Sequence, residues 1–178
     1  NLDSQWWGAE YRYLTKVGSK HRLTIGGEYV DYFQQDQSNR DLDPVLSCIS
    51  SATPTLPCLD SRESSKTWGL FVQDEFAITD KLTLNLGVRH DNLYRGTDST
   101  NPRAGLIYNP TESTTLKLLY GTAFRAPNGY ELFYTGVNYQ PNPDLAPEKI
   151  KTLEFAVEHS FSKNLRGTAS VYGYRLSD

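Results

Sequence analysis

The sequence lacks several features that mark common classes of metalloprotein. Among its 178 residues there is no Met, and there are only two Cys and three His. His21, His90 and His159 are far apart, and none has a partner at the spacing of a zinc site. Because soft ligands such as thioether and thiolate are so scarce, we expect no metal site and no bound cofactor.

Long apolar runs and an excess of charge of one sign are also missing. The mean hydropathy of −0.56 and the polar interruptions exclude transmembrane helices. They do not exclude membrane strands, in which apolar and polar residues alternate. The 18 basic residues are balanced by 21 acidic ones. Nucleic acid is therefore not an expected partner, since phosphate binding needs a basic face.

Residue groups typical of enzymes are absent as well. There is no nucleophile beside a base and no Gly-rich phosphate loop. His90 and Asp91 are adjacent, but neighbouring residues of a strand point to opposite faces and cannot act as a pair on one surface. A lipid hydrolase that uses His90 is a distant alternative. We predict that the chain is not an enzyme.

What the chain does have is a period of two. Between Lys81 and Asp91 four aliphatic residues point one way, and the residues between them, which include Arg89, point the other way. Similar alternation recurs along the chain, and predicts about eight antiparallel strands of roughly ten residues, long enough to cross a membrane when tilted. The polar face carries a charge on strand after strand, as expected of a wet barrel lumen. A soluble sandwich with solvated charges is the alternative.

The connections between the predicted strands alternate in length. Residues 18–20, 79–81, 110–113 and 162–164 form short polar turns, whereas residues 35–65, 95–101 and 125–148 form longer connections. Outer-membrane barrels have short periplasmic turns and longer extracellular loops. The fold class that we predict is therefore all-β, an antiparallel transmembrane β-barrel.

Asp74 interrupts an otherwise apolar face that contains Trp68, Val72 and Phe76. A charge facing lipid costs a few kcal/mol at the midplane of the bilayer and roughly 0–1 kcal/mol near an interface. We expect either that Asp74 lies below the midplane or that a local bulge turns it away.

Cys48 and Cys58 lie close together in a polar segment, and we expect them to form a disulfide. Closing so short a loop would contribute roughly 3 kcal/mol in the chain-entropy model. Two unpaired loop thiols are the alternative.

Three segments resemble a known family in their residues, order and spacing. They are GLFVQDEF at 69–76 with TDKLTL at 79–84 and GVRHD at 87–91, then YGTAFRAP at 120–127 with YELF at 130–133, and finally NPDLAPEK at 142–149. Together they are similar to the barrel of TonB-dependent outer-membrane receptors. The resemblance implies that residues 1–178 are part of a 22-stranded barrel, four hairpins in this chain, whose lumen is closed by a plug domain that this chain lacks.

The resemblance also implies a function and a place in the cell. It implies active uptake of a scarce nutrient, such as a ferric siderophore, cobalamin or another metal complex, across the bacterial outer membrane. The partners would be outer-membrane lipid, the small-molecule ligand, and TonB acting through the missing plug. We expect the chain to be an internal piece of a longer protein, since it has neither an initiator Met nor a signal peptide.

The candidate ligand-binding residues lie in the third long connection. They are Arg125, Tyr130, Phe133, Tyr134 and Tyr139. Pro127 ends the preceding strand, the pair 128–129 allows a turn with positive φ, and Arg125 can pair with Glu131. Anchoring of a loop over the barrel rim is the favoured interpretation, and contact of these residues with an anionic or aromatic ligand is the alternative.

A self-contained eight-stranded barrel with a structural or adhesive role is the alternative architecture. Eight strands are enough to close a barrel, but side chains must then fill its interior. The inward-facing glycines would leave voids there; they are Gly26, Gly87, Gly105 and Gly121. The sequence therefore favours a larger barrel.

Overall fold

A single antiparallel sheet makes up nearly all of the described chain. The computed structural model describes residues 2–39, 59–93, 97–133 and 142–177. Its strands are paired in sequence order from first to last. They are β1 (Leu2–Val17), β2 (His21–Asn39), β3 (Leu59–Thr79), β4 (Leu82–Asn92), β5 (Asp98–Thr111), β6 (Thr114–Arg125), β7 (Glu148–Ser162) and β8 (Leu165–Ser177), with one short helix, α1 (Gly129–Phe133), between β6 and β7.

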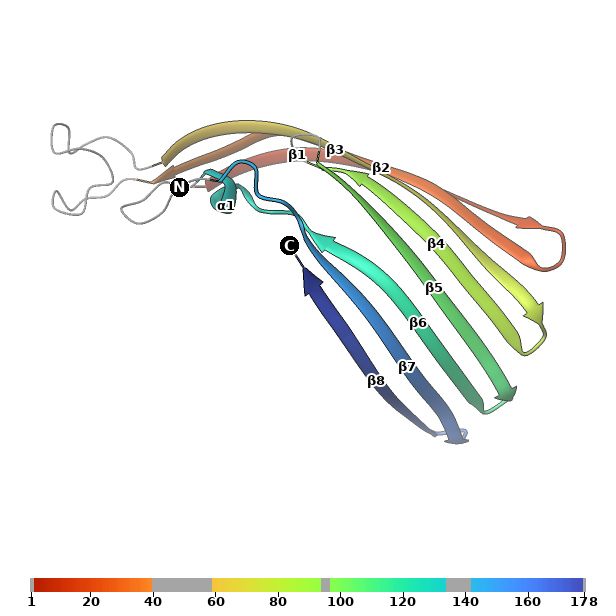
Figure 1. The fold of residues 1–178 in the computed structure, drawn as a ribbon. Coiled ribbons are helices and arrows are strands. Elements are labelled where there is room, and N and C mark those ends of the chain that lie inside the picture. The colour runs from red at the N-terminus through yellow and green to blue at the C-terminus, as the bar shows by residue number, and fades with distance from the viewer. Residues whose placement is uncertain (1, 40–58, 94–96, 134–141, 178) are drawn as a thin grey trace, which may run out of the picture.

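The prediction of eight antiparallel strands is confirmed. Figure 1 shows a curved sheet whose short turns all lie at one end, while α1 lies at the other. In the β1–β2 turn Gly18 has a φ of 64°, a backbone conformation that favours glycine. Within the described residues no helix is both long and apolar enough to cross a membrane.

The sheet is open. Among the residues that the structure describes, β1 pairs only with β2 and β8 pairs only with β7, so these two strands form the edges of the sheet. The eight strands of this chain do not close on themselves, and the alternative of a self-contained barrel is not supported.

Two predicted connections and one predicted turn differ from the structure. β2 continues to Asn39 and β3 starts at Leu59, so much of the predicted connection 35–65 is strand. β5 likewise begins at Asp98, inside the predicted connection 95–101. At these strand ends polar residues occupy both faces, so the period of two is lost although the ladder continues. The expected positive-φ turn at 128–129 is also wrong, since Gly129 begins α1.

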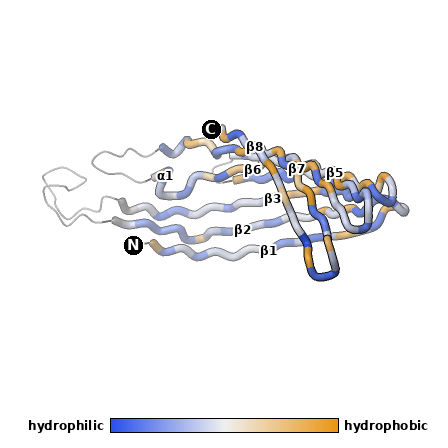
Figure 2. Tube along the Cα trace, turned by 90° about the horizontal axis from the view of Figure 1, so that it is seen from below, coloured by the Kyte–Doolittle hydropathy of each residue, from blue (hydrophilic) through white to orange (hydrophobic). Residues whose placement is uncertain are grey.

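The two faces of the sheet are those that the alternation predicts. The face that carries Leu70, Val88, Leu118 and Phe155 is apolar, and we call it the apolar face. The opposite face carries most of the charged side chains of the strand centres, and we call it the polar face. Figure 2 shows hydrophobic and hydrophilic residues alternating along the strands.

Asp74 lies on the apolar face in an unbroken ladder. The β3–β4 pairing is regular from Trp68 to Ala77, so of the two alternatives for Asp74 the local bulge is wrong. Asp74 Oδ2 lies 2.7 Å from Nδ1 of His21, the first residue of β2, and the His21 ring stacks on Phe76. Its position near the short turns, together with this partner, is what accommodates the carboxylate.

Candidate functional site

The polar face of the first four strands carries a row of four residues in register. Arg12 is opposite Gly26, Gly26 is opposite Phe71, and Phe71 is opposite Arg89. The guanidinium carbons of Arg12 and Arg89 lie 5.8 and 6.0 Å from the centre of the Phe71 ring. Both distances are in the range of cation–π attraction. A rigid aromatic ring thus lies between two cations on the polar face.

Arg89 also joins two carboxylates. Its Nη2 donates to Glu28 Oε2 at 2.8 Å, and its Nε donates to Asp91 Oδ1 at 2.7 Å. Asp91 is 5% exposed, and its second carboxylate oxygen is buried with no hydrogen-bond partner among the described residues. We call Arg12, Glu28, Phe71, Arg89 and Asp91 the Arg89 network.

Two glycines make this close arrangement possible. A Cβ on Gly26 would overlap the Phe71 ring and lie 2.7 Å from the Tyr11 carbonyl oxygen. A Cβ on Gly69 would lie 2.5 Å from both Arg89 Nη2 and Asp91 Oδ1. In each case the missing side chain leaves the space into which a cross-strand neighbour leans.

The Arg89 network borders a hollow on the polar face. This groove has a volume of about 750 Å³, and residues from β1 to β6 line it. Charged and amide side chains on its wall include Glu10, Gln73 and Arg103. The groove offers both donors and acceptors and contains an aromatic surface, as expected for a polar, partly aromatic small molecule.

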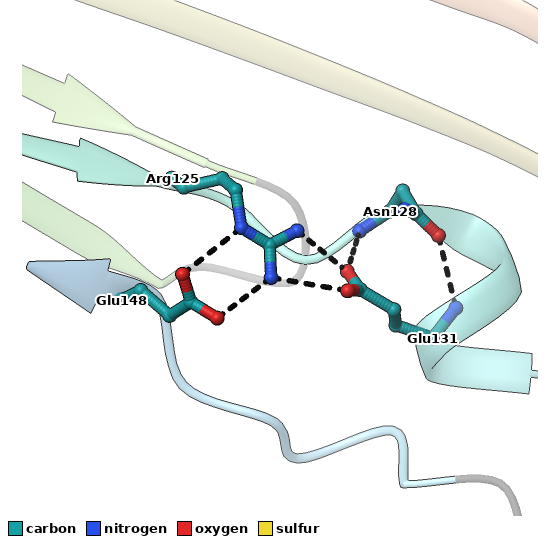
Figure 3. A network of polar contacts seen from close by, with 4 residues as sticks. All are labelled: Arg125, Asn128, Glu131 and Glu148. Atoms are coloured by element: carbon teal, nitrogen blue, oxygen red, sulfur yellow. Dashed lines mark hydrogen bonds and ion pairs between the residues drawn. The ribbon is translucent and has the colours of Figure 1, made fainter.

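A second group of charges lies where β6 ends and β7 begins. Arg125 Nη1 and Nη2 donate to the two oxygens of Glu131 at 2.9 and 3.0 Å, and its Nε and Nη2 donate to Glu148 at 3.1 and 2.7 Å. Figure 3 shows the guanidinium between the two carboxylates. We call Arg125, Asn128, Glu131 and Glu148 the Arg125 cluster. The predicted Arg125–Glu131 pair is confirmed.

The same glutamate also fixes the start of α1. Asn128 Oδ1 accepts from the Glu131 backbone N–H at 3.0 Å, and the Asn128 N–H donates to Glu131 Oε2 at 2.9 Å. This reciprocal pair is a capping box, which satisfies two N–H groups at the helix start. The hydrogen bonds from Arg125, and then that from the Asn128 N–H, lower the pKa of Glu131 from its usual value.

The helix α1 follows β6 in the chain but contacts β2, which lies several strands away in the sheet. Gly129 lies so close to Gln37 of β2 that a Cβ at this position would overlap the Gln37 amide. The following Leu132 is 5% exposed. The connection after β6 therefore reaches back to the loop end of β2, and Figure 1 shows α1 at that end of the sheet.

The candidate ligand-binding residues have different placements. Arg125 is held by two carboxylates, and Tyr130 on α1 is 49% exposed. Phe133 ends α1, but its side chain is not among those that the structure describes. Tyr134 and Tyr139 fall outside the described residues, as do Cys48 and Cys58, so their contacts and the disulfide stay predictions.

The Arg89 network is not among the sites predicted from the sequence. The alternation places Glu28, Arg89 and Asp91 on the polar face, but it does not give the register that makes them neighbours. Two signals in the sequence could have indicated the network. One is Phe71, an unexpected aromatic residue on the polar face, and the other is the glycines opposite long side chains.

Comparison with known proteins places the chain in a family. The family model for the TonB-dependent receptor-like β-barrel matches residues 1–178. Among curated relatives, the iron-regulated outer membrane virulence protein of Vibrio cholerae is 28% identical over 159 residues, with 85% of this chain and 23% of that protein covered. The hemin receptor of Yersinia enterocolitica is 30% identical over 167 residues, with 81% and 22% covered.

Solved structures show the same fold. The siderophore receptor PirA of Acinetobacter baumannii matches with a TM-score of 0.74 and 18% identity, over 99% of this chain and 27% of that one. A mutant ferric enterobactin receptor of Pseudomonas aeruginosa, in complex with enterobactin, matches with a TM-score of 0.74 and 21% identity, over 96% and 26%. The chain spans about a quarter of the length of these proteins. This chain belongs to the β-barrel family of TonB-dependent receptors.

Proposed function

We propose that the chain is part of the barrel of an outer-membrane receptor that takes up a scarce nutrient in a TonB-dependent manner. The observation that carries this proposal is the match of the family model to the whole open sheet. The chain would supply barrel wall, lumen lining and extracellular loops. The polar face would face the lumen, and the apolar face would face lipid.

The substrate class that we propose is a metal chelate, such as a ferric siderophore or haem, or a vitamin such as cobalamin. Similar proteins include a hemin receptor and a siderophore receptor. The groove beside the Arg89 network supports this class, since its cations and the Phe71 ring could contact an anionic, aromatic ligand on its path. TonB would act through a plug domain outside this chain.

The Arg125 cluster would position the extracellular loop. Because Arg125 is held by Glu131 and Glu148, it would anchor the loop, whereas Tyr130 on the same loop would be presented to the ligand. Phe133, Tyr134 and Tyr139 would add aromatic surface at low entropic cost. We infer a role in transport rather than catalysis.

The test is uptake by the bacterium that encodes the full-length receptor. The gene would be deleted, and uptake of radiolabelled ferric enterobactin, hemin and cobalamin would be compared with the parent under iron limitation. We expect one of the three to fall to the level of a strain without TonB, and to be restored by the gene supplied in trans.

Dissipating the proton gradient is the energy control. It should abolish uptake in the parent and change nothing in the deletion strain. Equal uptake of all three compounds in parent and deletion strains would contradict these three as substrates. Uptake that the deletion abolishes, but that persists in the strain without TonB, would contradict the TonB-dependent mechanism.

A further inference from the structure

The connection after β6 contains an Asn–Gly pair, Asn128–Gly129, and no other Asn of the sequence is followed by Gly. In such a pair the backbone nitrogen of the glycine can attack the side-chain amide carbon of the asparagine, because glycine has no Cβ to obstruct the approach. Every other Asn is followed by Leu, Arg, Tyr or Pro, and these residues hinder the attack with a side chain or, for Pro, with a ring on the nitrogen. Asn128 is therefore the asparagine whose amide is most open to this reaction.

The reacting groups of the pair are accessible in the folded chain. Asn128 is exposed, so water reaches its side-chain amide. Among the described residues, neither Asn128 Nδ2 nor the Gly129 N–H has a hydrogen-bond partner. The leaving group and the nucleophile are thus both free of competing contacts.

The capping box is what restrains the reaction. Asn128 Oδ1 accepts from the Glu131 N–H at 3.0 Å, and this bond fixes the side-chain amide that would have to rotate toward Gly129. The Asn128 N–H donates in return to Glu131 Oε2 at 2.9 Å, and Figure 3 shows Glu131 held from the other side by Arg125. The attack therefore needs a local opening of the capping box, and its rate follows the population of the open form.

We propose that Asn128 is a site of covalent modification, at which the amide is converted to aspartate or isoaspartate when the capping box opens. The Gly129 nitrogen forms a bond to Cγ of Asn128, the bond from Cγ to Nδ2 breaks, and ammonia leaves with the proton of the Gly129 N–H. Water then opens the resulting cyclic imide at either carbonyl, which gives aspartate or isoaspartate. No group is oxidised or reduced, and water is the co-reactant.

The two products differ in what they do to the loop. Aspartate keeps the acceptor oxygen and the capping box, whereas isoaspartate carries the main chain through the side-chain carbons and lengthens it by one carbon atom. The acceptor is then displaced relative to the Glu131 N–H, so α1 loses its cap and Tyr130 its fixed position. Modification thus releases the loop irreversibly and progressively as the receptor ages. This inference goes beyond the proposed function and holds whichever nutrient is imported.

The test follows the full-length receptor, purified in detergent and kept at growth temperature in mildly alkaline buffer. At intervals the tryptic peptide 126–149 would be analysed by mass spectrometry with electron-transfer fragmentation, which separates asparagine, aspartate and isoaspartate at position 128. Asn138, followed by Tyr139, is the internal reference in the same peptide. Glu131→Ala removes one half of the capping box, and Glu112→Ala in the β5–β6 turn is the matched control. The peptide 126–149 on its own gives the rate without the fold.

We expect isoaspartate to accumulate at Asn128 faster than at Asn138, and Glu131→Ala to raise its rate about fivefold, the factor by which loss of such a cap favours the open form. Glu112→Ala should leave the rate unchanged, and the isolated peptide should react at least as fast as the Glu131→Ala variant. A rate at Asn128 no higher than at Asn138 would overturn the proposal. So would equal rates in the receptor and the isolated peptide, a comparison that needs no variant to fold.

Discussion

At the scale of single residues, the polar face depends on positions where a side chain is missing. Gly26 leaves the space that the Phe71 ring occupies between Arg12 and Arg89. We predict that Gly26→Ala destabilises the folded receptor by about 1–3 kcal/mol, because the added methyl group meets the Tyr11 carbonyl oxygen as well as the ring. The measurement is the midpoint of urea unfolding, followed by the loss of the SDS-resistant band.

Gly121 provides the matched control for this prediction. It lies on the same face, and substitution by Ala there adds a Cβ with no atom of another described strand within 4 Å. Gly121→Ala should leave the unfolding midpoint within about 0.5 kcal/mol of the wild type. Equal effects of the two substitutions would show that the contact with Phe71 is unimportant.

Ionisation of Glu131 makes the stability of the loop around it depend on pH. Its pKa is lowered by the hydrogen bonds from Arg125 and then by that from the Asn128 N–H. A carboxylate whose folded pKa is depressed contributes stability that is present above its unfolded pKa of about 4.3 and is lost as the pH falls through the folded pKa. We therefore predict that residues 126–133 lose protection from hydrogen exchange, corrected for intrinsic rate, as the pH falls below the unfolded pKa and through the lower folded pKa of Glu131.

Glu131→Gln is the control for that titration. It cannot ionise, so residues 126–133 should exchange faster at neutral pH. The further change in acid should be smaller than in the wild type and should come from Glu148, whose pKa Arg125 also lowers. If the wild type and this variant gave the same pH profile, Glu131 would not be the group that holds the loop.

At the scale of elements, α1 has only five residues and depends on its capping box. Replacing an Asn cap by Ala costs about 1 kcal/mol of helix stability. We predict that Asn128→Ala raises the exchange of the Glu131 amide, whereas Asn128→Asp preserves it, since Asp accepts the same hydrogen bond. Equal protection of this amide in the two variants would contradict the capping role.

The sequence predicts the elements better than it predicts their extents and their neighbours. The alternation around Lys81–Asp91 and Leu153–Val157 predicts strands and faces, because a membrane barrel exposes one face to lipid and the other to the lumen. The end of β6 at Arg125 follows from Pro127. The extension of β2 to Asn39 could not be predicted, because polar residues on both faces give no period.

The Arg89 network could not be predicted from the sequence for a different reason. Arg89 and Glu28 are 61 residues apart in the sequence and on strands that do not pair with each other. Their contact depends on the register of two successive pairings and on Gly69 lying between them. A period of two gives the face of a residue but not its cross-strand partner. Pairs within one connection, such as Arg125 and Glu131, need no register and could be predicted.

At the scale of the whole molecule, the open edges decide whether the chain can stand alone in a membrane. The outer edges of β1 and β8 present backbone N–H and C=O groups that have no ladder partner in this sheet. Each such group costs several kcal/mol in hydrocarbon, so a spanning sheet must close.

We predict that residues 1–178 expressed alone aggregate on refolding into detergent micelles and give no SDS-resistant monomer, whereas the full-length receptor gives one. The two chains would be refolded side by side and compared by heat-dependent gel mobility and chemical cross-linking. An SDS-resistant monomer of the isolated chain would mean that β1 and β8 can pair after all. That result would restore the self-contained eight-stranded barrel, whereas aggregation through the strand edges is what a section of a larger barrel should show.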